Sequence, residues 1–350
     1  MSVSAEMLAQ MRGFLETLLA GRNLSAAEAA ALLGGLTEPE LPAPLAGGLL
    51  IALRAKGVCA DELRGLATAM RALARRPALP PGLPAVDIVG TGGDASGSFN
   101  LSTGAALLTA ACGVAVVKHG NRSISSRSGS ADVLEQLGLR LPLGEQAAAA
   151  CLAASNFTFL FAPHYHPAMK AIAPVRAALG VRTVFNILGP LTNPAAPPFQ
   201  VIGAFDAGVA KLMADAFAGM PIERAFVVHS DNGWDEPTPI APFRIFDVRP
   251  SSVRELARSA ADYGLPSCTA ADLAGGDAPH NAQALRAVLT GADRGAHRDA
   301  VLLGCALALE VTGRAPSPRE AVALAAQAID TGAARELLQR LTEFGRGLAP

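Results

Sequence analysis

Cysteine is scarce in this sequence, and its spacing fits neither disulfides nor metal sites. The 350 residues include five cysteines: Cys59, Cys112, Cys151, Cys268 and Cys305. Their number is odd, they are widely scattered, and none forms a C-x-x-C pair or a cluster with histidine. Secreted domains pair their cysteines, and zinc sites need closely spaced Cys and His ligands. We therefore expect a cytoplasmic protein with neither a disulfide nor a zinc site.

Long hydrophobic runs are missing as well. Hydrophobic residues make up 51% of the chain, but charged residues, Gly or Pro interrupt them. The most apolar stretch, residues 105–117, is too short to cross a bilayer, which takes about 20 residues. Near the N-terminus, Glu6, Arg12 and Glu16 break the apolar pattern that an export signal needs. We expect no membrane segment and no export signal.

The chain also lacks an excess of positive charge. It has 29 Lys and Arg against 30 Asp and Glu, a net charge of −1, and no long basic run. Binding to duplex nucleic acid depends on clustered Lys and Arg that neutralise phosphates. The composition therefore predicts no nucleic-acid partner.

The first part of the chain has the pattern of a helical unit. From Met7 to Leu18, apolar residues recur at the spacing of one helix face, and Ser25 with Glu28 offers a capping box for a second helix. Further helical patterns follow at 43–56 and 61–75. These patterns predict a helical N-terminal domain over residues 1–76.

A proline-rich segment then separates this unit from an alternating one. Four prolines within residues 77–84 exclude a helix or a central strand, so we predict a hinge or linker over 77–85. Strands are predicted at 86–89, 114–118, 158–161, 200–205, 225–229 and 244–248, and helices at 102–112, 130–137, 145–154, 208–219, 281–290, 297–310 and 318–342. The alternation predicts an α/β domain over residues 86–350 with a mostly parallel central sheet.

Two loops after predicted strands are suited to bind phosphate. In Gly90-Thr-Gly-Gly-Asp94, the glycines let backbone N–H groups approach an anion, and a helix starting at Asn100-Leu-Ser-Thr103 would aim its N-terminus there. In Lys118-His-Gly-Asn-Arg122, the two cations can neutralise phosphate, and five serines follow between 123 and 130. The alternatives are an ordinary tight turn and a solvated basic turn. Both loops would open at one edge of the sheet, which favours a phosphorylated ligand.

Later segments add carboxylates and a cation. Asp235 and Glu236 follow a predicted strand and are suited to hold Mg²⁺ on a substrate phosphate, with an exposed acidic turn as the alternative. His164 and His166 end another strand, but without a third ligand nearby we do not predict zinc. Arg176 is a candidate partner for a carboxylate; a surface arginine is the alternative.

Together these segments resemble the anthranilate phosphoribosyltransferase family. The resemblance runs from about residue 5 to 346. It rests on GTGGD at 90–94, FNxST at 99–103, KHGNR at 118–122, SADVLE at 130–135, APxxHPAMK at 162–170, PVRxxLGxRTxFNxLGPLTNP at 174–194 and GxDE at 233–236. The family resemblance implies a helical domain, joined by helices from about 176–196, an α/β domain of the nucleoside phosphorylase and phosphoribosyltransferase type, an active site at the hinge, and a homodimer.

The resemblance also implies the reaction and its residues. Phosphoribose passes from 5-phospho-α-ribosyl diphosphate (PRPP) to the amine of anthranilate in tryptophan biosynthesis. The implied PRPP site comprises Gly90, Gly93, Asp94, Ser98, Asn100, Leu101, Ser102, Thr103, Lys118, His119, Gly120, Asn121, Arg122, Ser123, Ile124, Ser125, Ser126 and Ser130. The implied anthranilate contacts are Gly90, Asn121, His166 and Arg176, the Mg²⁺ ligands Ser102, Asp235 and Glu236, and the catalytic residues Lys118, Arg176 and Asp94.

General chemistry agrees with this resemblance. Breaking the bond from C1 to diphosphate puts negative charge on the leaving group, which Mg²⁺, Lys118 and backbone N–H groups can stabilise. The aromatic amine is unprotonated at neutral pH, so no strong base is needed. Three alternatives remain: transfer to a related aromatic amine, a pyrimidine nucleoside phosphorylase, and a non-catalytic nucleic-acid-binding relative. Several positions depart from the family pattern. Trp234 stands where a smaller aliphatic residue is common, Pro237-Thr-Pro239 follows the acidic pair, Ser230 and His280 stand where a glycine and an acid are usual, and Gly304 stands where Asn is usual.

Overall fold

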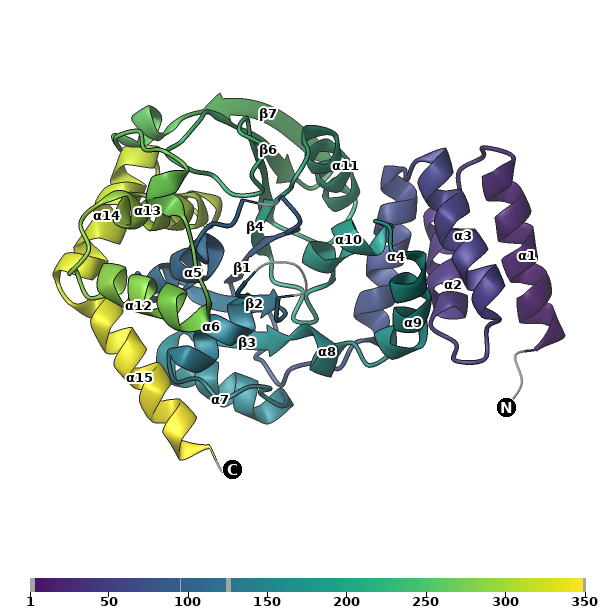
Figure 1. Cartoon of the computed structure of the whole chain (residues 1–350), viewed down its shortest axis with the longest axis horizontal. Helices are drawn as coiled ribbons and strands as arrows, with labels where there is room; N and C mark the ends of the chain where they lie inside the picture. Colours follow the sequence, from purple (N-terminus) through teal and green to yellow (C-terminus); the bar gives the residue numbers. More distant parts are fainter. Residues whose placement is uncertain (1–3, 95, 124–126, 349–350) are drawn as a thin grey trace.

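The computed structural model describes residues 4–94, 96–123 and 127–348 and shows a helical bundle beside a larger α/β unit (Figure 1). The bundle begins with α1 (Ala5–Leu19), α2 (Ala26–Leu36), α3 (Ala43–Lys56) and α4 (Ala60–Leu73). Its helices start where the sequence supplies caps; Ser25 accepts a hydrogen bond from the backbone N–H of Glu28 and completes the capping box. The predicted combination of a small helical domain and a larger α/β domain is confirmed.

A single seven-stranded sheet forms the centre of the α/β unit. Its strands are β1 (Ala85–Gly90), β2 (Ala115–Gly120), β3 (Phe157–Phe161), β4 (Phe199–Gly203), β5 (Arg224–Ser230), β6 (Phe243–Arg249) and β7 (Ser252–Arg258). The order is β3-β2-β1-β4-β5-β6-β7. The first five strands in that order are parallel, and β6 and β7 are antiparallel. The prediction of a mostly parallel sheet is confirmed.

Helices cover both faces of this sheet. They are α5 (Leu101–Ala111), α6 (Ser130–Gln136), α7 (Glu145–Ser155), α8 (Ala162–Tyr165), α9 (Met169–Leu179), α10 (Phe185–Leu188), α11 (Ala207–Ala218), α12 (Ala278–Leu289), α13 (Ala296–Val311), α14 (Pro318–Asp330) and α15 (Ala333–Gly347). Short 3₁₀ helices lie at η1 (Gly189–Thr192), η2 (Ala260–Tyr263) and η3 (Ala271–Leu273). Among the described residues, no helix is long and apolar enough to cross a bilayer.

Two parts of the predicted pattern are wrong. The single helix over 318–342 is two helices, α14 and α15, because Gly332 between them has φ of +90° and a left-handed residue ends a helix. The strand β7 was not predicted, because its residues are half-buried or exposed and form no apolar run. It is an edge strand that pairs with β6 alone.

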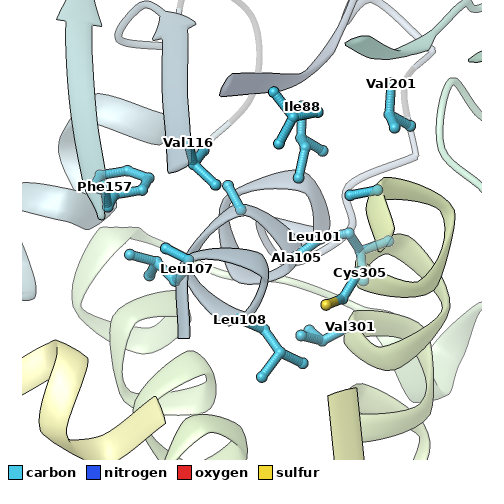
Figure 2. Packing of buried hydrophobic residues seen from close by; sticks show 14 of the residues in the cluster. Ile88, Leu101, Ala105, Leu107, Leu108, Val116, Phe157, Val201, Val301 and Cys305 are labelled. Atoms are coloured by element: carbon cyan, nitrogen blue, oxygen red, sulfur yellow. The ribbon is translucent and has the colours of Figure 1, made fainter. Parts of the chain in front are cut away.

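One core lies between the sheet and α5 with α13 (Figure 2). Ile88 and Val116, from neighbouring parallel strands, and Leu108 of α5 and Val301 of α13 are all fully or almost fully buried there. The two helices approach closely, with Ala105 of α5 at the contact. This packing fixes α5, so that its N-terminus lies at the carboxyl ends of β1 and β2.

The other core joins the helical bundle to the opposite face of the sheet. It includes Leu66 of α4, Ile172 of α9, Ile202 of β4 and Phe217 of α11. Helix α9 contacts α3, and η1 contacts α4, so a segment from the second half of the chain completes the bundle. Figure 1 shows α9 next to the N-terminal helices, in agreement with its contact with α3.

The close approach of α5 and α13 gives a stability prediction. A Cβ atom built at Gly304 would lie 2.8 Å from the Cβ of Ala105. The substitution Gly304→Asn, which restores the usual family residue, is expected to lower the free energy of unfolding by about 1–3 kcal/mol through overpacking. Urea unfolding followed by circular dichroism measures this. Adding Ala105→Gly should recover much of the loss, and an unchanged midpoint for Gly304→Asn alone would contradict the prediction.

Candidate functional site

The candidate site lies at the carboxyl edge of the sheet, where loops from neighbouring strands meet. Strand β1 lies between β2 and β4, so the loops that follow these three strands share one edge. The glycine-rich loop at 90–94, the N-terminus of α5 and the acidic pair at 235–236 are in contact there. Ligands of open α/β sheets bind at such edges.

Asp235 is held against glycine backbone. Its Oδ2 accepts a hydrogen bond of 2.6 Å from the backbone N–H of Gly92, and its own N–H donates to Oδ2 of Asp94 at 3.3 Å. A Cβ at Gly90, the last residue of β1, would overlap the Asp235 carboxylate, and one at Gly203, the last residue of β4, would overlap its backbone oxygen. Only glycine at both strand ends admits the acidic loop.

Glu236 lies at the start of α5. The backbone N–H of Ser102 donates to Oε1 of Glu236 at 2.9 Å. The first N–H groups of a helix have no partner within the helix, and the helix dipole favours a negative charge there. The carboxylate is therefore fixed next to the Ser102 hydroxyl, the third predicted Mg²⁺ ligand.

The two carboxylates oppose each other's ionisation. Burial raises the pKa of Asp235 to about 7, and the nearby Asp94 charge adds to the shift. Burial also raises the pKa of Glu236 to about 8, with the charge of Asp235 as the next cause. Carboxylates in such a position are stabilised in their ionised form by a cation.

Lys118 lies beneath this pair and is almost completely buried. Its Nζ donates to the backbone oxygen of Ile88 and to the Ser102 hydroxyl, the latter at 3.4 Å. Burial lowers its pKa, while Asp87, Glu236 and Asp235 act in the opposite direction. The three carboxylates thus favour a positively charged Lys118 under the site, against the effect of burial.

The predicted phosphate donors at residues 118–122 do not all point to the same place. His119 follows Lys118 in a strand, so its side chain lies on the opposite face of the sheet. Its ring meets His166 edge-on, with ring centroids 5.0 Å apart, and both histidines are buried. Burial lowers the pKa of His119 well below its usual range and that of His166 to about 4. The alternation of side chains along the strand separates residues that are neighbours in sequence.

Arg122 also differs from its predicted part as a phosphate partner. Its guanidinium donates to Asp132 at 2.9 Å and to both oxygens of Glu135 at 2.6 Å, all from α6. In this arrangement its charge is already neutralised by two carboxylates. Asn121 is exposed beside it, and its Oδ1 accepts from the backbone N–H of Arg122 at 2.7 Å.

The remaining predicted PRPP residues surround the same edge. Asn100, at the start of α5, donates to the backbone oxygen of Ser128 at 3.2 Å and accepts from Asn281 at 2.9 Å. The others are placed as follows: Gly93 in the glycine-rich loop, Ser98 before α5, Leu101 and Thr103 buried in its first turn, Gly120 at the end of β2, Ser123 with its N–H bonded to Asp132, and Ser130 at the start of α6. Ile124, Ser125 and Ser126 lie outside the described residues.

Arg176 is a cation without an anionic partner among the described residues. It lies in the last turn of α9, half-buried, with its Cζ 5.0 Å from the centre of the Phe185 ring. Its guanidinium forms no hydrogen bond or ion pair within the part of the chain that the structure describes, and burial lowers its pKa. Unlike Arg122, it is available for a carboxylate.

Sequence reasoning missed Arg182. Its guanidinium donates to the backbone oxygen of Gly93, and its Cζ lies 4.3 Å from the centre of the Phe205 ring. Its own backbone oxygen accepts from Arg54 of α3 at 2.7 Å. Arg182 therefore connects the helical bundle to the glycine-rich loop. Its place in the PVRxxLGxRT motif was the available signal, but only the fold shows that it reaches that loop.

Trp234 stabilises the acidic loop from behind. Its side chain is buried in the core of the α/β unit, and its backbone oxygen accepts from the N–H of Ser230 at 3.1 Å. The large residue at this position therefore points into the core. It leaves the carboxylates of Asp235 and Glu236 in their contacts with the glycine-rich loop and α5.

The donor set fits a hard cation that shares its ligands with a substrate. Among the residues described, no group of three or more His, Cys, Asp or Glu is arranged to hold a metal by itself. Mg²⁺ commonly uses one or two carboxylates and completes its shell with water and phosphate oxygens. Asp235, Glu236 and the Ser102 hydroxyl offer oxygen ligands of that kind.

Comparisons with known proteins agree with this architecture. Residues 12–74 match the helical bundle domain of a glycosyl transferase family, and residues 82–335 match the a/b domain of that family. Anthranilate phosphoribosyltransferase of Desulforudis audaxviator is 47% identical over 334 residues, which cover 95% of this chain and 96% of the relative.

Solved structures give the same result. Anthranilate phosphoribosyltransferase of Thermus thermophilus superposes with a TM-score of 0.89 at 41% identity, covering 95% of this chain and 99% of that one. The Saccharomyces cerevisiae enzyme in complex with PRPP and Mg superposes with a TM-score of 0.88 at 26% identity, covering 97% and 99%.

The buried histidine pair predicts a pH-dependent stability. Folded His166 stays neutral down to about pH 4, whereas the unfolded chain protonates it below about 6.5. The unfolded state therefore binds more protons between these values, and the free energy of unfolding should fall by about 2 kcal/mol from pH 7 to pH 5 for His166 alone. Urea unfolding at several pH values measures the slope. His166→Gln should reduce the slope of the free energy of unfolding against pH, and the control His280→Gln, at an exposed histidine, should leave it unchanged. Equal slopes for His166→Gln and the unsubstituted chain would contradict the prediction.

Proposed function

Because the chain belongs to the anthranilate phosphoribosyltransferase family, we propose that it transfers 5-phosphoribose from PRPP to the amine of anthranilate and releases diphosphate. The product is N-(5-phosphoribosyl)anthranilate, an intermediate of tryptophan biosynthesis. The observation that carries this proposal is the acidic pair, buried Asp235 and half-buried Glu236, in contact with the glycine-rich loop and the N-terminus of α5. A site of this kind suits a diphosphate that arrives with its cation.

The PRPP site extends from the glycine-rich loop to α5 and the loop after β2. Backbone N–H groups around Gly93 and at the start of α5 are the donors for the diphosphate, and Asp94 orients a ribose hydroxyl. Lys118 acts from beneath through its charge, because its buried Nζ is already bonded to Ile88 and Ser102. It offsets negative charge that accumulates on the leaving diphosphate.

Mg²⁺ is the cofactor, held by Asp235, Glu236 and the Ser102 hydroxyl together with PRPP. When bound, it supplies positive charge that neutralises the diphosphate. The raised pKa values of the two carboxylates support this assignment, since a cation favours their ionised forms.

The acceptor site lies across the boundary from the diphosphate. Arg176 of α9 pairs with the anthranilate carboxylate, and Gly90, Asn121 and His166 line the pocket. A bidentate guanidinium–carboxylate pair would fix the orientation of the ring and present the amine to C1. The amine carries a free lone pair at neutral pH, so the chain's part is to position it and exclude water.

The arrangement of the whole molecule follows from these roles. Residues 1–76 form the helical domain, residues 77–85 the hinge and residues 86–350 the catalytic domain, with Arg176 contributed by a helix that packs on the helical side. Exposed Leu19 of α1 and Ile51 of α3 support a homodimer through the bundle. The five free cysteines support a reducing, cytoplasmic location.

The reaction can be tested by anthranilate fluorescence. Purified chain mixed with anthranilate, PRPP and Mg²⁺ should consume the fluorescence and release diphosphate in equal amounts, and excess EDTA should stop both. Fluorescence that persists while the folded chain still binds PRPP would show that the acceptor is another amine. Failure to bind PRPP would contradict the proposal as a whole.

The carboxylate-anchoring role of Arg176 gives a separate prediction. Arg176→Ala should raise the KM for anthranilate about tenfold or more, because a charge-assisted hydrogen bond is lost, and should change the KM for PRPP little. Steady-state kinetics with each substrate varied in turn measure the split. Arg176→Lys should lie between, and Arg12→Ala on α1 is the matched control. An equal rise in both KM values would exclude this role.

A further inference from the structure

A cavity lies at the opposite edge of the sheet from the acidic pair. Its volume is about 640 Å³. Ala85, the first residue of β1, and Val117 of β2 form part of its lining. The rest comes from the last turns of α4, from linker residues 76–83, and from the loops at 194–198 and 220–223. We call it the amino-edge cavity; none of the residues assigned to PRPP, anthranilate or Mg²⁺ lines it.

Its walls are apolar and stiff. Prolines of the linker and of the facing loops line it, among them Pro77, Pro80, Pro194 and Pro198, together with Met220. Proline has no backbone N–H and a fixed φ angle, so these walls offer few donors and change shape little. Such a surface suits the apolar body of a small molecule.

One wall carries a cation with no partner. Arg71 of α4 lines the cavity, and its Nε and Nη2 atoms are buried without a hydrogen-bond partner. It forms no ion pair with any residue of the described ranges. Among the residues that the structure describes, Asp87 is the carboxylate that favours its charge. The oxygens of Asp87 already accept from Asn193 at 2.8 Å and from the His119 N–H at 3.2 Å.

A buried guanidinium without an acceptor is unfavourable. Burying a charged group that lacks a partner is among the larger destabilising terms in a protein. Burial lowers the pKa of Arg71 to about 10, the direction expected for a desolvated cation. An anion in the amino-edge cavity would pair with the side of the guanidinium that lines the cavity and offset its positive charge.

The charge balance of the lining favours an anion as well. Arg71 and Arg76 contribute positive charges, and Glu223 is the one acidic residue among the described lining residues. Glu223 and Arg71 are too far apart to form an ion pair, so the two charges do not satisfy each other. The cavity therefore combines a net positive charge with apolar walls.

We propose that the amino-edge cavity binds a small organic carboxylate with an apolar body, whose carboxylate pairs with Arg71. The ligand would contact the helical bundle through α4, the linker, and the α/β unit through β1 and β2. It would thus hold the two units together at a place remote from the reacting groups. The site is independent of the proposed reaction, which takes place at the other end of the same strands.

The first test measures binding of cyclohexanecarboxylate to the full chain by ligand-observed NMR. The Arg176→Ala variant is used throughout, so that the acceptor site does not capture the probe. Saturable binding is expected, and adding Arg71→Met should weaken it about tenfold or more, the effect of losing a charge-assisted pair. Absence of saturable binding, or equal binding with and without Arg71→Met, would overturn the proposal.

A second pair of variants does not depend on Arg71. Ala72 is exposed on α4 and lines the cavity, so Ala72→Trp should fill it and abolish binding. The neighbouring Leu73 is 45% exposed and does not line it, so Leu73→Trp is the matched control and should bind the probe normally. Inorganic phosphate is the second probe. Tight binding of phosphate with none of cyclohexanecarboxylate would show a phosphate site and overturn the assignment to an apolar carboxylate.

Discussion

A buried and a half-buried carboxylate held side by side are the constraint on which the rest of the site depends. Asp235 and Glu236 are kept there by backbone N–H groups of Gly92 and Ser102. Both donors are backbone N–H groups, which move only when the main chain moves. The glycine-rich loop and α5 must therefore hold fixed positions relative to the acidic loop. The parallel strands β2, β1, β4 and β5 are neighbours in that order, so the loops after β1 and β5 and the start of α5 meet at one edge.

The packing behind the site keeps this geometry in place. Helix α5 is clamped between the sheet and α13, and the Trp234 side chain anchors the acidic loop in the same core. Lys118 places a positive charge under the pair without reaching solvent. On the other side, Arg182 forms hydrogen bonds with Gly93 and with Arg54, so the helical bundle also contacts the glycine-rich loop. The edge at which we propose that the substrate binds is therefore in contact with both units.

Much of this was predictable from the sequence because the relevant signals are local. A buried strand followed by glycines predicts the element and the loop after it, as at β1 and residues 90–94, and the binding of phosphate by that loop stays a prediction. Contacts between distant segments were not predictable. The pairing of Arg122 with Asp132 and Glu135 depends on the direction in which α6 leaves its loop, and the separation of Lys118 from His119 depends on which residues of β2 face α5. Arg71 gave no signal, because its isolation is a property of the packed molecule.

The central claim is that the acidic pair of Asp235 and Glu236 is the cation site through which PRPP binds. The most direct test is isothermal titration calorimetry of PRPP into the chain, with and without Mg²⁺. The titrations are repeated on a double variant that combines Asp235→Asn with Glu236→Gln, and on the control Asp231→Asn, which changes an exposed carboxylate. The account predicts that Mg²⁺ strengthens PRPP binding in the unsubstituted chain and in the control, and that the double variant loses this dependence while remaining folded. Mg²⁺-dependent binding of equal strength in the double variant would contradict it.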